Sequence, residues 1–147
     1  MTKVKFAVFV TLIVVSVLAT AAFASTKRST ISLRSTAVGK VLVGANGRTL
    51  YLFTHDKGAK SSCYGQCAAY WPPLIARKAT VGAGLKASLL GTTKRKDGKL
   101  QVTYRGHPLY FFLPDKKAGD LNGQGYVHFG GTWWVVSAAG AKITTKP

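Results

Sequence analysis

The segment RTLYLFTHDKGAKSSCYGQCAAYWPPL, residues 48–74, places aromatic side chains around two cysteines, and part of its pattern returns in HPLYFFLPDKKAGD, residues 107–120. Seven of the thirteen positions from 47 to 59 are identical to the positions 59 residues later. The repeated residues are Gly47, Leu50, Tyr51, Phe53, Asp56, Lys57 and Ala59, which recur as Gly106, Leu109, Tyr110, Phe112, Asp115, Lys116 and Ala118. Self-similarity at a constant spacing indicates an internal duplication.

Each copy has the pattern of a β-hairpin. In GKVLVGANGRTLYLF, residues 39–53, two β-prone runs flank Asn46-Gly47, a pair typical of tight hairpin turns. In GKLQVTYRGHPLYFFL, residues 98–113, a run over 99–104 and a run over 109–113 flank a turn at Gly106. Alternate side chains of an extended strand share a face, and here both faces are largely apolar. The motif strands are therefore predicted to be covered on both sides.

Regular structure outside the hairpins is predicted to be short. SSCYGQCAAY, residues 61–70, favours a short helix capped by Ser61 or Ser62 and ended by Trp71-Pro72-Pro73, and residues 82–91 favour a helical turn. A β-prone run covers 132–137, and residues 141–146 are a candidate edge strand. The predicted fold is mainly β, with duplicated β-hairpin units forming one small sandwich- or barrel-like domain with one or two short helices.

The N-terminal residues have the three-part pattern of a secretory signal peptide. Lys3 and Lys5 precede an apolar block over 6–18, and Ala22-Phe23-Ala24 provides a cleavage site. The block is shorter than the roughly 18 to 20 residues of a spanning helix, so residues 1–24 are predicted to be removed. Residues 25–37 are predicted to be a flexible basic leader and residues 38–147 one β domain, with related halves at about 38–79 and 97–138. No later segment is long and apolar enough to span a membrane.

The charge of the chain is strongly unbalanced. Without Lys3 and Lys5, 19 basic residues remain against four aspartates, so the net charge after cleavage would be +15. Such a surface attracts polyanions. The clustered cations predicted to bind anions are Lys94, Arg95, Lys96, Lys116 and Lys117. Because the chain is predicted to be exported, we expect anionic cell-envelope polymers or lipids as partners, and no dedicated nucleic-acid role.

The repeated residues also carry a family resemblance. Tyr51, Phe53 and Asp56 in one copy, and Tyr110, Phe112 and Asp115 in the other, fit the pattern Tyr-x-(Phe/Trp/Tyr)-x-x-Asp. With Ser62-Cys63-x-Gly65-x-Cys67-Ala68, Trp71-Pro72-Pro73-Leu74, Gly119-Asp120 and Trp133-Trp134, the chain resembles a bacterial secreted-repeat family of unknown function, described as predicted lipoproteins with that motif. The resemblance implies a secreted or envelope-attached protein and no established activity. No cysteine near position 24 offers a lipid attachment site.

The two cysteines have two interpretations. In an oxidising compartment Cys63 and Cys67 are expected to be bridged, with Gly65 providing the distorted turn that a bridge across four residues needs. Alternatively, the thiolates and a distant histidine are the ligands of a copper site; His55, His107 and His128 are available.

The aspartates of the motif have a structural and a chemical interpretation. Asp56 and Asp115 each end an apolar run, where a carboxylate can accept bonds from backbone amides of the following turn. We therefore interpret them as turn caps, with ligands or bases as the alternative. No signature of nucleophilic catalysis is present. The sequence predicts a secreted or envelope-associated, non-catalytic binding or structural protein without a cofactor; the alternative is an extracytoplasmic copper or redox-linked binding protein.

Overall fold

The structure, a computed structural model, describes residues 30–147. The predicted signal peptide and residues 25–29 of the predicted leader lie outside this range. No helix within residues 30–147 has the length and apolar character needed to cross a membrane. The elements, in chain order, are β1 (Ile31–Thr36), β2 (Gly39–Gly44), β3 (Tyr51–Phe53), α1 (Gln66–Tyr70), the 3-10 helix η1 (Ala87–Leu89), β4 (Leu90–Lys94), β5 (Leu100–Tyr104), β6 (His107–Pro108), β7 (Tyr126–His128) and β8 (Gly131–Val135).

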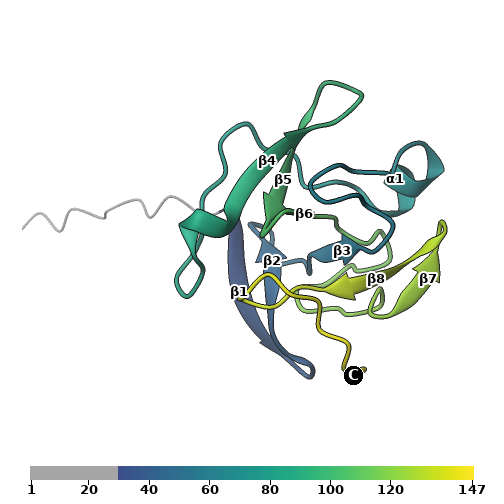
Figure 1. Cartoon of the computed structure of the whole chain (residues 1–147). Helices are drawn as coiled ribbons and strands as arrows, with labels where there is room; N and C mark the ends of the chain where they lie inside the picture. The colour runs from purple at the N-terminus through teal and green to yellow at the C-terminus, as the bar shows by residue number, and fades with distance from the viewer. Residues whose placement is uncertain (1–29) are drawn as a thin grey trace, which may run out of the picture.

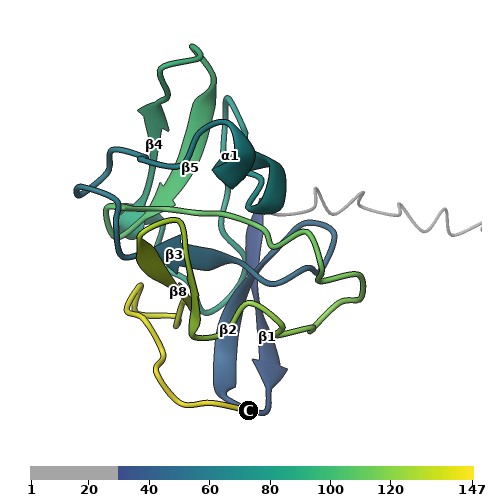
Figure 2. The ribbon, with the colours of Figure 1, turned by 90° about the vertical axis from the view of Figure 1, so that its right-hand side faces the viewer.

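The fold is mainly β, as predicted. Residues 30–147 form three small antiparallel sheets, with the strand orders β1-β2, β3-β8-β7 and β4-β5-β6, and these do not close into a barrel. The β1–β2 hairpin lies at one end of the molecule and the β4–β5 hairpin at the other, with β3 and β8 between them (Figures 1 and 2).

Each repeat begins with a strand that the sequence interpretation placed outside it. β1 pairs with β2 along its whole length, from Ile31 with Gly44 to Thr36 with Gly39. The prediction of a flexible leader over 25–37 is therefore wrong for residues 31–36: their Ser and Thr side chains hid a strand with a buried first residue, Ile31. β4, the equivalent strand of the second repeat, begins 59 residues after β1 and pairs with β5. The repeats thus start near 31 and 90, earlier than the predicted 38 and 97.

The motif strands leave their predicted hairpin partners and pair across the two repeats. β3 runs antiparallel to β8, with Tyr51 opposite Val135 and Phe53 opposite Trp133. In the second repeat, the amides of Phe111 and Leu113 donate to the carbonyls of Pro72 and Tyr70, at 2.8 Å each. The predicted turns are retained, since the amide of Leu50 donates to Leu42 and β5 pairs with β6. Each repeat therefore completes the sheet structure of the other.

The alternation along the motif strands separates two hydrophobic clusters. Tyr51, Phe53, Tyr110 and Phe112 lie in one cluster with Trp71, Trp133 and both cysteines. Leu50, Leu52 and Leu109 lie in the other, with residues of β1, β2 and β5. The prediction that both faces of the motif strands are covered is confirmed, except at the C-terminal end of the second strand, where Leu113 is exposed.

The short helices differ in detail from the prediction. α1 starts after Gly65 and has no side-chain cap, so neither Ser61 nor Ser62 caps it. The predicted helical turn over 82–91 is reduced to η1, and the predicted edge strand over 141–146 to a single bridge between Val136 and Lys142.

Candidate functional site

The two copies of the motif meet face to face. The backbone amide of Tyr51 donates to the carbonyl of Tyr110 at 2.8 Å, and the amide of Tyr110 donates back to Tyr51 at 3.0 Å. The side chains cross in the same way. The Tyr51 hydroxyl donates to Asp115 Oδ2 at 2.6 Å, and the Tyr110 hydroxyl donates to Asp56 Oδ2 at 2.8 Å. Each Tyr of one copy thus bonds the Asp of the other, which relates the repeats by an approximate two-fold axis between the tyrosines.

The second oxygen of each aspartate holds the loop that follows it. Asp56 Oδ1 accepts bonds from the backbone amide and hydroxyl of Ser62, at 2.8 and 2.9 Å. Asp115 Oδ1 accepts bonds from the backbone and side-chain nitrogens of Asn122, both at 3.0 Å. The aspartates therefore accept backbone amides six and seven residues ahead, beyond the adjacent turn in which capping was predicted. Sequence comparison of the copies reveals the Tyr and Asp residues, but not that they pair between copies.

Burial governs the protonation of this network. It raises the pKa of both tyrosine hydroxyls far above their ordinary value, and each facing carboxylate adds to the effect. It also raises the pKa of Asp56 and Asp115, against the hydrogen bonds that each carboxylate accepts, which lower it. The tyrosines stay protonated at physiological pH, so they serve as hydrogen-bond donors rather than as bases.

Asp115 should give the stability of the protein a recognisable pH dependence. Folding raises the pKa of the Asp115 carboxyl above its ordinary value of 3.8. Its contribution to the stability of the folded protein is therefore fully present below the unfolded pKa and is lost as pH rises through the folded pKa. The melting temperature of the parent minus that of Asp115→Asn should therefore be larger at pH 4 than at pH 7. For Asp97→Asn the difference should be smaller at pH 4, since hydrogen bonding lowers the pKa of that exposed carboxyl. A melting-temperature difference for Asp115→Asn that grows toward pH 7 would contradict a raised pKa for Asp115.

A stack of four aromatic rings fills the centre of the molecule. Phe53 lies on Trp133, Trp133 on Trp71 and Trp71 on Phe112, with ring centroids 3.9, 3.9 and 4.0 Å apart. The edge of Tyr51 meets Trp71 and the edge of Tyr110 meets Trp133. Both tryptophans are fully buried, so they belong to the core and are not surface platforms for a ligand.

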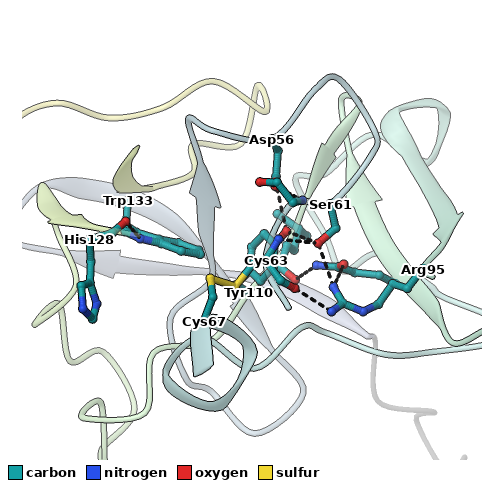
Figure 3. Close-up of a disulfide and its surroundings, with 11 residues drawn as sticks. Asp56, Ser61, Cys63, Cys67, Arg95, Tyr110, His128 and Trp133 are labelled. Atoms are coloured by element: carbon teal, nitrogen blue, oxygen red, sulfur yellow. Dashed lines mark hydrogen bonds between the residues drawn. A yellow bond between two sulfur atoms is a disulfide. The ribbon is translucent and has the colours of Figure 1, made fainter. Parts of the chain in front are cut away.

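Cys63 and Cys67 form the predicted disulfide, with their Cα atoms 5.2 Å apart. Gly65 between them has a φ of 55°, which supplies the predicted distortion. Figure 3 shows Asp56, Ser61, Tyr110 and Arg95 on one side of this bridge and Trp133 and His128 on the other. Both cysteines are buried in the aromatic cluster, so the disulfide fixes the loop before α1 to the core.

Arg95, predicted to bind anions, is instead a buried structural residue. Its guanidinium donates to Ser61 Oγ, Gln101 Oε1 and the carbonyl of Cys63 at 2.7 to 2.8 Å. The guanidinium carbon, Cζ, lies over the ring of Tyr64, 4.4 Å from its centroid. The prediction is therefore wrong for this residue: its charge is used to join β4 to the disulfide loop. The other four predicted anion-binding residues, Lys94, Lys96, Lys116 and Lys117, have exposed side chains. No feature of the sequence around Arg95 predicts that it is buried while the adjacent lysines are exposed.

The residues of the alternative copper site are not gathered in one place. The disulfide occupies both sulfur atoms, and within residues 30–147 no group of three or more His, Cys, Asp or Glu side chains could hold a metal ion. His55 is exposed, while His128 packs against Phe129 with centroids 3.8 Å apart. His107 lines a cavity together with Asp56.

A shallow cationic groove lies beside the β4–β5 hairpin. It has a volume of about 630 Å³, and Arg77, Lys94 and Lys99 line it together with Asp97 and the apolar side chains of Ile75 and Leu100. Of the predicted anion-binding residues, only Lys94 lies in it; Arg77 and Lys99 were missed because they are distant from each other in sequence.

Comparison with known proteins gives one match. A family described as a secreted repeat of unknown function matches the chain twice, over residues 32–75 and over residues 91–137. These segments coincide with the two structural repeats that begin at β1 and β4. The match confirms the resemblance found from the motif and agrees with the predicted secreted location. No curated protein and no solved structure matches the chain significantly.

Proposed function

We propose that this chain, which belongs to the family of secreted repeats of unknown function, is a non-catalytic binding protein for anionic polymers of the cell envelope. The observation that carries the proposal is the use of its acidic residues. All four aspartates accept hydrogen bonds from within the chain, and none forms an ion pair with a lysine within residues 30–147, so the surface lysines remain available to external anions.

The engagement of each carboxylate can be followed in the structure. Asp56 and Asp115 bind the motif tyrosines, as described above. Asp120 Oδ2 accepts bonds from the backbone amides of Lys116 and Lys117, at 2.9 and 2.8 Å. Asp97 accepts a bond from the amide of Lys99 and lies 3.5 Å from Arg95 Nε, the one ion pair within residues 30–147. None of these carboxylates forms an ion pair with a lysine side chain within that range.

The groove beside the β4–β5 hairpin supports the polymer as the partner. Its three cationic residues surround exposed apolar surface, and Ile75 is 42% exposed. An extended polymer can place its charged groups near the cations and its backbone against the apolar surface. Attraction between exposed charges is screened by salt over about 8 Å at physiological ionic strength, so such binding should be reversible and salt-sensitive.

Removing the cations around the groove should weaken the binding of dextran sulfate, a soluble anionic polymer. For Arg77→Gln/Lys94→Gln/Lys99→Gln we expect about a tenfold loss of affinity at low salt, since each exposed charge contributes up to about 1 kcal/mol. A matched triple variant, Lys40→Gln/Lys86→Gln/Lys146→Gln, removes the same charge elsewhere and should lose much less. Affinities can be measured by biolayer interferometry at several salt concentrations, with uncharged dextran as the ligand control.

Two outcomes would count against the proposal. Equal losses in the two triple variants would show that net charge alone, without a site, attracts the polymer. Binding that does not weaken as salt rises would exclude a partner recognised by its charge.

A further inference from the structure

A second cavity lies between the first motif and the C-terminal segment, and the polymer proposal does not use it. Its volume is about 510 Å³, within the range of small-molecule sites. Leu52 and Phe53 provide apolar lining, and Thr54, Asp56, Arg105, His107 and Lys142 provide polar groups. These residues come from both repeats and from the segment after β8.

The equivalent position in the other copy is filled by the protein itself. Arg48 and His107 are related by the 59-residue spacing of the repeats. Arg48 Nη2 donates to the carbonyl of Phe112 at 2.7 Å, and its guanidinium lies 5.2 Å from the ring of Phe111. The loop after the second motif closes over this side, where the Thr49 hydroxyl donates to the carbonyl of Asp120 at 2.6 Å.

The loop after the first motif does not close in this way. Lys57 and Lys60 bond each other across a tight turn, at 3.1 Å in both directions. Leu52 and His107 line this cavity, whereas their repeat equivalents Phe111 and Arg48 lie at the filled position. The side chains of Leu52 and His107 are smaller than those of Phe111 and Arg48. The approximate two-fold symmetry is therefore broken here, and the open copy retains the cavity.

The polar groups of the cavity are held in position. Arg105 Nη1 donates to the carbonyl of Ala139 at 3.0 Å, and a Cβ at Gly140 would lie 2.5 Å from the Cβ of Arg105. Only glycine therefore allows the C-terminal segment to approach Arg105 so closely. Asp56 Oδ2 accepts one bond, from Tyr110, and a carboxylate oxygen has capacity for a second. Burial, together with Arg105, lowers the pKa of His107, so its imidazole is neutral at pH 7 and can both donate and accept.

We propose that this cavity binds a sugar acid, a pyranose ring that carries one carboxylate and several hydroxyls. The ammonium group of Lys142 and the guanidinium of Arg105 face the carboxylate, while Asp56 and His107 bind the hydroxyls. An anion without hydroxyls would place its charge beside the Asp56 carboxylate with no donor between them, and a neutral sugar would leave Lys142 and Arg105 without a counter-charge. The mixture of groups therefore favours a ligand that has both a carboxylate and hydroxyls.

Titration of the mature protein with D-glucuronate, with D-glucose as the control, tests this site. D-glucose differs only in having a hydroxymethyl group in place of the carboxylate. Chemical-shift changes in ¹⁵N-resolved spectra should cluster at residues 54–58, 105–107 and 140–142 with D-glucuronate alone. Lys142→Gln should weaken binding about tenfold through the loss of one charge-assisted hydrogen bond, whereas Lys146→Gln, an exposed lysine four residues further on that does not line the cavity, should not.

The same titration separates the source of the sugar acid and the two proposals. Stronger binding of a glucuronate tetramer than of the free sugar assigns a polymer as the source, and equal binding assigns the free acid; both support the site. The groove variant Arg77→Gln/Lys94→Gln/Lys99→Gln should keep its affinity for D-glucuronate even where dextran sulfate no longer binds. Equal shifts with D-glucose, absence of binding, shifts elsewhere, or equal losses in the Lys142 and Lys146 variants would overturn the sugar-acid site.

Discussion

Expressed as separate chains, residues 30–78 and 79–147 should each be unfolded, and mixing them should restore the folded domain. The reason is the exchange of strands between the repeats. β3 has its partner β8 in the second half, while residues 110–113 have theirs at 70–73 in the first. The Tyr–Asp pairs and the aromatic stack also draw their members from both halves. Either half alone would expose its apolar faces and leave its motif strand unpaired.

Circular dichroism and ¹⁵N-resolved spectra of each half and of the equimolar mixture measure this outcome. A chain of residues 30–147 cut after Lys78 is the appropriate control, because Arg77 and Lys78 are exposed and the cut breaks no sheet pairing. It should retain the spectrum of the intact protein. A single half that gives dispersed signals of a monomeric fold would show that one repeat is an independent domain and would contradict the exchange.

Trp133→Ala should destabilise the protein by about 3 to 5 kcal/mol, a large part of the roughly 5 to 15 kcal/mol that holds a domain of this kind together. Trp133 is fully buried, stacks on both Phe53 and Trp71, and meets the edge of Tyr110. Its removal leaves a cavity between rings that come from both repeats. Chemical denaturation, followed by circular dichroism, measures the free energy of unfolding.

The neighbouring tryptophan provides the matched control. Trp134 has the same side chain on the same strand, but it points to the opposite face and is only partly buried. Trp134→Ala should therefore cost clearly less than Trp133→Ala. If the two substitutions had equal effects, the stack would not be the main contributor to the stability of the core.

The sequence determined the local structure where local chemistry decides it. Nearly continuous apolar runs predicted that the motif strands are covered on both faces, and the turns at Asn46-Gly47 and Gly106 were placed correctly because their residues favour those backbone conformations. The disulfide followed from two cysteines around a glycine in an exported chain. The repeated motif was enough to predict the internal duplication of the chain, its mainly β fold and its family. β1 was missed because its polar Ser and Thr side chains carry no apolar period, although its first residue is buried.

Only the tertiary structure decided which residues meet. The repeat spacing identifies Tyr51, Asp56, Tyr110 and Asp115 as equivalent pairs, but a pairing within each copy fits that spacing as well as the pairing between copies that is observed. Arg95 has the sequence surroundings of its exposed neighbours and becomes buried because the disulfide loop, 32 residues earlier, presents a carbonyl to it. The same holds for the cavity beside Asp56: two equivalent loops differ in whether they close, and that depends on contacts between residues far apart in the chain. Hydrogen bonds and packing at such distances follow from how the halves fit together, which a local pattern does not encode.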